Sequence, residues 1–310
     1  MRPAELLRTF ARGFAMGSAD IVPGVSGGTV ALVFGIYRRL IEGIRHGSTA
    51  LGRFLRLDLQ GGTASLREVE WGFLLPLLAG IGAAVLVLSS LIESLLHDHP
   101  VEMAGLFTGL VLGSVVIAWG LLQRRDLPRL AVLAVTAVAV FLLMGITSGT
   151  SEETVSQISD PALWAFLGAG AVAICAMILP GVSGSFLLVT MGMYGAVLAA
   201  VNDRDLVAIG LFGLGCVVGL ALFSQVLHWA LSTHYDTVMA ALIGLMLGSL
   251  RVLWPWPSGV DSTELAAPAD PVVVPILLCV IGLVVVLAVD VVGRRLERQT
   301  TSDEVDDLHV

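Results

Sequence analysis

The sequence contains no lysine and little charge of either sign. Its 310 residues include seventeen basic residues, all of them arginine, and 25 acidic ones, so that only 14% are charged. A soluble domain usually carries about 25% charged residues. In place of charge the chain has long apolar runs, and 56% of its residues are hydrophobic. This composition excludes an ordinary soluble domain and indicates an all-α polytopic membrane protein.

Cysteine and histidine are also scarce, and neither is spaced for chemistry. Cys175, Cys216 and Cys279 lie far apart in apolar stretches without a CxxC pair, which is typical of small core residues. The histidines show no metal-ligand spacing, and no Ser/His/Asp or paired-carboxylate arrangement stands out. We therefore expect no catalytic residues, no metal and no cofactor, and a protein that is not an enzyme. No nucleic-acid partner is expected.

The pentapeptide Pro-Gly-Val-Ser-Gly occurs twice, at residues 23–27 and 180–184, and each copy interrupts an apolar stretch. Proline removes a backbone donor and glycine weakens a helix, so each copy breaks the helical hydrogen-bond ladder. Within hydrocarbon such a break is tolerated only where protein or a wet cavity covers it. Two breaks at matching places predict a transporter binding site. The alternative is a packing kink, in which glycine allows close helix contact and serine caps a helix.

The two halves of the chain are also related outside the pentapeptide. Segment 109–114 recurs at 244–249 with the same glycine, leucine and serine positions, 135 residues later. The pentapeptides lie 157 residues apart, and the difference of 22 fits an insertion in the arginine-rich segment 38–70. Each half then holds one broken segment and three spans. Because three is odd, the second half enters the membrane from the opposite face, which predicts two inverted-topology repeats.

We predict a first repeat at residues 1–150 and a second at 151–294, followed by an acidic cytoplasmic tail at 295–310. The predicted spans are 71–92, 103–123, 130–147, 205–230, 237–254 and 272–293. The broken segments, 10–37 and 163–200, are predicted to be re-entrant hairpins, with full spans as the alternative. About nine residues follow the first break before Arg38, which is roughly 14 Å of helix against a hydrocarbon core of about 30 Å.

Arginine and acidic residues alternate between the predicted loops. Arginine concentrates in 38–70, 124–129 and 294–298, whereas the loops 93–102 and 148–162 are acidic. By the positive-inside rule the arginine-rich segments lie in the cytoplasm. The sequence therefore predicts a multi-pass protein of a bacterial plasma membrane with both termini cytoplasmic.

After each break a half-helix begins, with its first N–H groups pointing into the membrane interior. A helix N-terminus carries about half a positive charge and unpaired donors, so two facing N-termini form an anion site suited to phosphate. The predicted phosphate-binding residues are glycines and hydroxyls at these ends, together with two nearby arginines. They are Gly24, Ser26, Gly27, Gly28, Thr29, Gly181, Ser183, Gly184, Ser185, Arg12 and Arg251. For Arg251 a snorkelling side chain beside interfacial tryptophans is the alternative.

Asp20 lies three residues before Pro23, inside an apolar segment. A carboxylate within the membrane is costly and is a functional candidate by default. Three roles are open to it: proton uptake, a cap on the local backbone, or an ion pair with Arg12. Repulsion by a bound phosphate would favour its protonated form, which makes it the candidate for coupling to protons. Met177 occupies the matching position in the second half.

These motifs resemble those of the PopT family of bacterial polyprenyl-phosphate transporters. The first half contributes RGFAMG at 12–17, ADIVPGVSGGT at 19–29 and GIY at 35–37. The second half contributes LPGVSGS at 179–185, GMY at 192–194, GLMLGSLR at 244–251 and LWPW at 253–256. The resemblance covers nearly the whole chain except its ends and segment 38–70. Arg12 stands where lysine is expected about as readily.

This resemblance implies a flippase that moves undecaprenyl or decaprenyl phosphate across the plasma membrane and so recycles the lipid carrier of cell-wall synthesis. The partners expected are that lipid and the surrounding membrane lipids. A small-anion transporter or channel is the alternative, because it would share the inverted hairpins. A membrane lipid phosphatase is a weaker one, since it needs a nucleophile with a base or a set of metal ligands.

Overall fold

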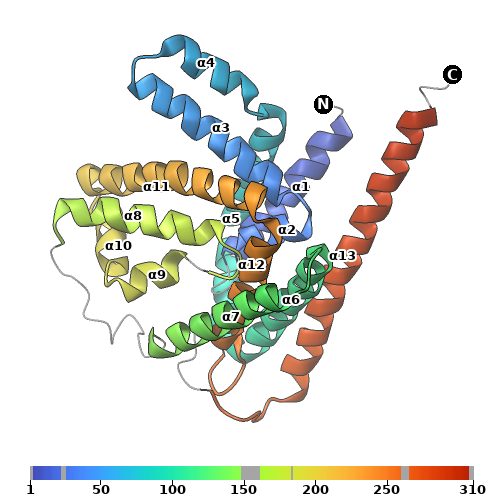
Figure 1. Cartoon of the computed structure of the whole chain (residues 1–310). Coiled ribbons are helices and arrows are strands. Elements are labelled where there is room, and N and C mark those ends of the chain that lie inside the picture. Colours follow the sequence, from blue (N-terminus) through green and yellow to red (C-terminus); the bar gives the residue numbers. More distant parts are fainter. Residues whose placement is uncertain (1–2, 22–25, 148–160, 183, 260–264, 307–310) are drawn as a thin grey trace.

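The computed structural model describes residues 3–21, 26–147, 161–182, 184–259 and 265–306, and its regular structure is entirely helical (Figure 1). Within these residues, six helices are long and apolar enough to cross a membrane. They are α5 (Trp71–Asp98), α6 (Pro100–Leu121), α7 (Leu127–Thr147), α11 (Leu206–Thr233), α12 (Tyr235–Ser249), whose span continues through the 3-10 turn η1 (Leu250–Leu253), and α13 (Val273–Asp306). The prediction of an all-helical polytopic membrane protein with six spans is confirmed.

Each pentapeptide separates a longer helix from a helix of seven residues. In the first half α1 (Pro3–Asp20) precedes α2 (Gly27–Val33), and in the second half α8 (Leu163–Ile178) precedes α9 (Gly184–Thr190). Both short helices end in a turn at a glycine with positive φ, +67° at residue 35 and +68° at residue 192. The same order of broken elements therefore occurs twice.

The two halves differ most in the segment that follows the broken elements. The first half continues with α3 (Tyr37–Leu55) and α4 (Leu59–Glu68), and the second with α10 (Tyr194–Asn202) alone. α3 is strongly amphipathic and lies with α4 at the same end of the molecule as the start of α1 (Figure 1). The additional residues of the first half in segment 38–70 therefore form the longer α3 and the extra helix α4.

The loop expected at residues 93–102 is shorter than predicted. α5 continues to Asp98 and α6 begins at Pro100, so His99 alone joins them. The acidic residues suggested a loop, but Leu95 and Leu96 pack on the hydrophobic core and extend the helix. The second half has the same junction, since His234 alone joins α11 to α12 with φ and ψ of −131° and 46°, close to −136° and 53° at His99.

Four helix pairs provide most of the packing: α1 with α5, α8 with α11, α6 with α13, and α7 with α12. Glycines allow these helices to approach closely. Gly109 of α6 lies against the backbone of Cys279, and the equivalent Gly244 of α12 lies against that of Leu133. The last span of each half therefore packs on the other half, and the two halves exchange α7 and α13.

We expect the substitution Gly109→Val to destabilise the protein far more than Gly120→Val on the same helix. A Cβ added at residue 109 would overlap the carbonyl oxygen of Cys279, whereas a Cβ added at residue 120 would have no other atom within 4 Å. Overpacking a close contact costs about 1–3 kcal/mol, and more where backbone must move. Thermal melting in detergent measures the effect, and equal melting temperatures would contradict the contact between α6 and α13.

Candidate functional site

The first break lies against the end of α8. Ser26 is 2% exposed, and its hydroxyl donates to the carbonyl oxygen of Met177 at 2.8 Å and accepts from the amide of Gly28 at 3.1 Å. Ser26 is therefore the N-cap of α2 and also joins the two halves. The last carbonyls of a helix lack partners within the helix, and here a side chain from the other half supplies one.

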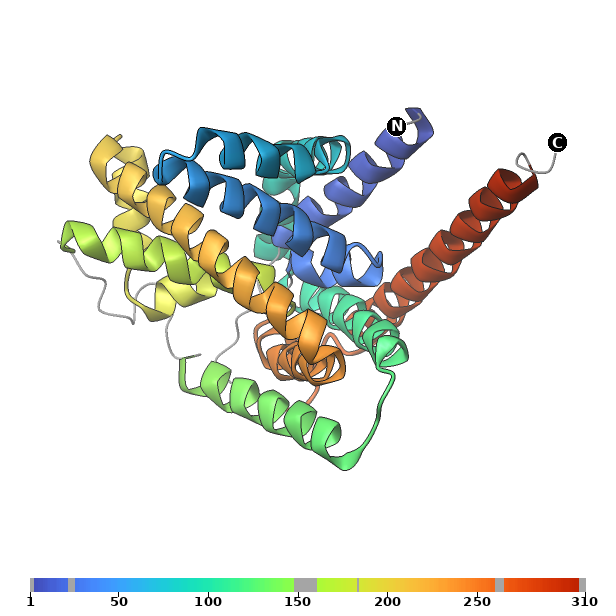
Figure 2. The same cartoon turned by 45° about the horizontal axis from the view of Figure 1, so that its top comes forward.

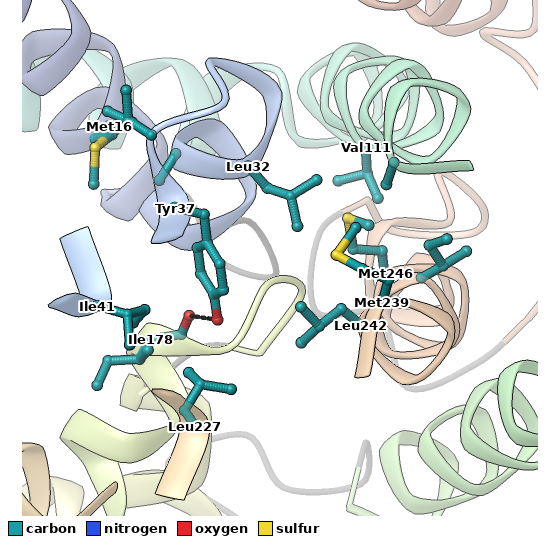
Figure 3. Packing of buried hydrophobic residues seen from close by; sticks show 14 of the residues in the cluster. Met16, Leu32, Tyr37, Ile41, Val111, Ile178, Leu227, Met239, Leu242 and Met246 are labelled. Atoms are coloured by element: carbon teal, nitrogen blue, oxygen red, sulfur yellow. Dashed lines mark hydrogen bonds between the residues drawn. The ribbon is translucent and has the colours of Figure 1, made fainter. Parts of the chain in front are cut away.

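Tyr37 makes a second link of the same kind. Its hydroxyl donates to the carbonyl oxygen of Ile178 at 3.2 Å, and its ring is buried between the halves (Figure 3). Tyr37 is not among the phosphate-binding residues predicted from the sequence. The available signal was its place two residues after Gly35, which Tyr194 repeats after Gly192.

Asp20 caps the backbone at the first break. Its Oδ1 accepts from the amide of Gly27 at 2.6 Å, and a Cβ at Gly27 would meet this carboxylate. Of the three roles left open by the sequence, the structure shows the cap. Because anions bind favourably at a helix N-terminus, the carboxylate occupies the place that a ligand anion would take. The amides of Gly27 and Gly28 are thus both occupied by side-chain oxygens of the protein itself.

Thr29 has a buried hydroxyl without a partner. The residue is 2% exposed, and its Oγ1 is one of four buried side-chain nitrogen or oxygen atoms in the described part of the chain that make no hydrogen bond. An unsatisfied buried polar atom needs an explanation, such as a missing ligand. Thr29 lines a cavity of about 490 Å³ whose wall is almost entirely apolar. A polar helix break and an apolar cavity therefore adjoin at this residue.

The second break packs on α12 rather than on α2. Gly181 has a φ of +82°, and a Cβ there would lie 2.9 Å from the Cα of Met246 and 3.0 Å from the Ser249 hydroxyl. Pro180 beside it is fully buried. This break therefore packs against the end of α12, which carries the repeated glycine-serine motif.

Three of the predicted phosphate-binding residues cannot be compared fully with the structure. Gly24 and Ser183 lie outside the described residues, and only the backbone of Ser185 is described, within α9. Gly184 is described and packs against Met177 and Ala173.

The two predicted arginines contact different helices. The guanidinium carbon of Arg12 lies 6.0 Å from the ring centroid of Phe34, near the end of α2. That of Arg251 lies 4.7 Å from the ring centroid of Phe141 on α7, close to Gly145, and its Nε is buried without a hydrogen bond. Both distances are typical of cation–π contacts.

The described residues contain no group of three or more His, Cys, Asp or Glu side chains that could hold a metal ion. The site combines a helix break, whose first amides are capped by Asp20 and Ser26, with an adjoining apolar cavity. Such an arrangement suits a ligand that joins an anionic group to an apolar chain.

Comparison with known proteins agrees with this chemistry. A family model described as VCA0040-like, undecaprenyl phosphate translocase-like, matches residues 16–267. A protein of Vibrio cholerae serotype O1 named polyprenyl-phosphate transporter is 40% identical over 250 residues, which cover 81% of this chain and 78% of that protein. A Staphylococcus aureus protein of the same name is 29% identical over 255 residues, covering 79% of this chain and 84% of that protein. No solved structure matches.

The match covers both breaks, the exchanged span α7 and the repeated motif of α12. The resemblance inferred from the motifs is thereby confirmed. The chain belongs to the VCA0040-like family of undecaprenyl phosphate translocase-like proteins.

Proposed function

We propose that this protein carries undecaprenyl or decaprenyl phosphate from the outer to the inner leaflet of a bacterial plasma membrane, and so returns the lipid carrier to cell-wall synthesis. The observation that carries the proposal is the junction at Thr29 between a polar helix break and an apolar cavity. The names of the two relatives support the same substrate. Moving a bare phosphate through hydrocarbon is prohibitive, so the protein's task is to replace its water.

The proposal includes two inverted repeats, which the directions of α5 and α11 support. α5 begins beside α3, where Arg39 donates to the carboxylate of Glu70 through its Nε at 2.7 Å. α11 ends beside α3, where the guanidinium carbon of Arg38 lies 5.9 Å from the ring centroid of Tyr235, two residues past the helix. These equivalent helices, each of 28 residues, thus run in opposite directions relative to α3.

The start of α12 supports the same topology. Asp236 accepts hydrogen bonds from the amides of Gln123 and Arg124, at 2.8 and 3.3 Å, just after α6. α6 therefore ends where α12 begins, although the two helices are equivalent in the repeat. α3 and α4, which carry the arginine-rich segment 38–70, lie at the end of the molecule where α1 begins and α13 ends (Figure 1), which favours cytoplasmic termini.

We assign the broken segments as re-entrant hairpins. α2 and α9 each contain seven residues, about 10 Å of helix against a hydrocarbon core of about 30 Å. The first break meets the end of α8, just before the second break, through the hydrogen bond from Ser26 to Met177. Hairpins from opposite faces that meet in this way place their breaks near the middle of the membrane.

The phosphate is proposed to take the place of the Asp20 carboxylate at the amide of Gly27, with Ser26, Thr29 and the glycines of both breaks around it. Protonation of Asp20 weakens its bond to that amide and removes its repulsion of the phosphate. The membrane potential opposes inward movement of an anion by about 2.3 kcal/mol per charge per 100 mV. Coupled uptake of a proton offsets this barrier.

Transport can be tested with purified protein in liposomes that carry labelled polyprenyl phosphate in the outer leaflet. We expect loss of the outer-leaflet label only in vesicles that contain the protein, faster when the proton gradient is directed inward. Flux of inorganic phosphate or chloride without lipid transport would favour the small-anion alternative. Release of inorganic phosphate from the lipid would favour a phosphatase.

A further inference from the structure

We propose that the cavity beside Thr29 binds the isoprene units next to the phosphate, so that the protein recognises the tail of its lipid as well as the headgroup. This inference rests on the transport function proposed above and specifies how that site selects its substrate. The rest of the long chain would remain in the bilayer.

The chemistry of the wall excludes a polar occupant. The cavity lies between α1, α2, α6 and α13, with one contact from α5, and none of its lining residues is charged. Three of them carry hydroxyls, but Ser18 donates to Phe14 and Ser114 to Leu110 within their own helices, each at 2.8 Å. Because a polar group buried here would find almost no partner, only an apolar chain fits.

The size of the cavity suits part of a chain. Its volume of about 490 Å³ lies within the range of about 300–1,000 Å³ that is usual for small-molecule sites. Three phenylalanine rings contribute to the wall: Phe14 of α1, Phe107 of α6 and Phe34, directly after α2. A pocket of this kind encloses a few branched isoprene units rather than a complete polyprenyl chain.

The position of Thr29 favours a prenyl phosphate over a phospholipid. Thr29 lines the cavity and lies two residues after Gly27, whose amide is capped by Asp20, and its own hydroxyl is buried without a partner. In a prenyl phosphate the phosphate is bonded directly to the first isoprene unit, so one ligand reaches both places. A diacyl phospholipid inserts a polar glycerol ester between phosphate and chains, and the almost entirely apolar wall does not suit this ester.

The remainder of the chain has a route into lipid along α13. Val285 and Val289 line the cavity, yet they are 48% and 38% exposed and so also reach the outer surface. The last part of α13 stands apart from α1 in both views (Figures 1 and 2). Since α13 is an exchanged span, this wall exists only when both halves are assembled.

The test compares Val285→Trp with Val284→Trp. The two valines are neighbours on α13 with exposures of 48% and 54%, but only Val285 lines the cavity. Binding is measured in nanodiscs by competition against labelled undecaprenyl phosphate, with farnesyl phosphate, dodecyl phosphate and inorganic phosphate as probes. Melting temperatures show whether each variant is folded.

We expect the wild type and Val284→Trp to bind farnesyl phosphate about tenfold or more tightly than the saturated dodecyl phosphate, since tail recognition of about 1.4 kcal/mol corresponds to that factor. Val285→Trp should lose this preference and keep its melting temperature. Equal binding of the two probes by the wild type, or equal effects of the two substitutions, would overturn the inference. If either of these results were found while the wild type still bound and transported undecaprenyl phosphate, the proposed function would hold, but the cavity would have no role in tail recognition.

A photoreactive probe gives an answer that does not depend on any substitution. Farnesyl phosphate with a diazirine on its first isoprene unit should label peptides that contain Phe34 or Val285 in the wild-type protein. Labelling of the same peptides to the same extent by a diacyl phospholipid with a diazirine in its chain would show an acyl chain as the occupant and overturn the inference. A wild type that bound no prenyl phosphate at all would refute the proposed function itself.

Discussion

In Gly181→Ala, transport of polyprenyl phosphate should fall sharply and the melting temperature should drop, whereas Gly35→Ala should transport normally and lose only the stability that left-handed strain costs. Both glycines have positive φ, +82° and +67°. A left-handed conformation costs an L-residue about 1–2 kcal/mol, and both substitutions bear this cost. Only the substitution at Gly181 adds a collision. The new Cβ would lie 2.9 Å from the Cα of Met246, whereas a Cβ added at Gly35 would have no other atom within 4 Å.

The collision has to move the second break away from α12. The Cα of Met246 is a backbone atom and Ser249 is fully buried, so neither can move aside alone. Relief of the collision therefore requires a shift of α12 or of the break itself. We expect an added cost of about 1–3 kcal/mol, which changes an equilibrium about 5- to 150-fold. The transport rate in liposomes, normalised to folded protein, measures the effect on the site separately from loss of stability.

Gly35→Ala serves as the control because it tests left-handed strain without a contact. If the two variants behaved alike, strain alone would explain the result, and contact between the second break and α12 would not matter for transport. If Gly181→Ala melted early but transported normally per folded molecule, the break would be a packing kink.

The substitution Asp20→Asn should remove the response of lipid binding and transport to pH. In the wild type, protonation of Asp20 removes a negative charge next to the proposed phosphate, so affinity should rise as the pH falls through the titration of this carboxyl group. An asparagine is neutral at every pH, and its side-chain oxygen can still accept from the amide of Gly27. We therefore expect affinity near the low-pH value throughout, and transport that no longer follows an imposed proton gradient.

The size of the change follows from linkage. A coupling free energy of about 1–3 kcal/mol between the proton on Asp20 and the bound phosphate changes the affinity for the lipid about 5- to 150-fold. By the same factor, bound lipid changes the affinity of Asp20 for the proton. Because a phosphate monoester itself titrates near pH 6, the quantity to compare is the difference between the wild type and Asp20→Asn at each pH. Isothermal binding measurements at each pH, together with transport assays with and without a proton gradient, measure this difference.

Asp236→Asn is a matched control for this experiment. Asp236 also accepts from backbone amides, those of Gln123 and Arg124, but it lies at the start of α12 and away from both breaks. Its replacement should leave the pH dependence unchanged. A wild-type profile in Asp20→Asn would show that coupling does not pass through Asp20, while leaving lipid transport itself intact.

Local properties of the chain were sufficient to predict its secondary structure. Runs of about twenty apolar residues can satisfy their backbone groups in a membrane only as helices, and the six predicted spans follow from this rule. The two pentapeptides predicted breaks for an equally local reason, since proline and adjacent glycine disrupt the ladder of their own helix. The continuation of α5 to Asp98 was not predicted, because it depends on tertiary contacts. Leu95 and Leu96 pack on the hydrophobic core and hold the last turns in the helix despite the acidic residue at its end.

Only the tertiary structure showed which remote residues meet. Ser26 joins Met177 across 151 positions and Tyr37 joins Ile178 across 141, and nothing near either residue in the sequence specifies such a partner. The exchange of α7 and α13 and the apolar cavity beside Thr29 likewise depend on how helices from both halves pack. Helix formation and breakage are determined by hydrogen bonds between neighbours along the chain, so the sequence alone predicts them. Close packing between distant helices depends on the shapes of both partners, and that is decided only when the whole chain has folded.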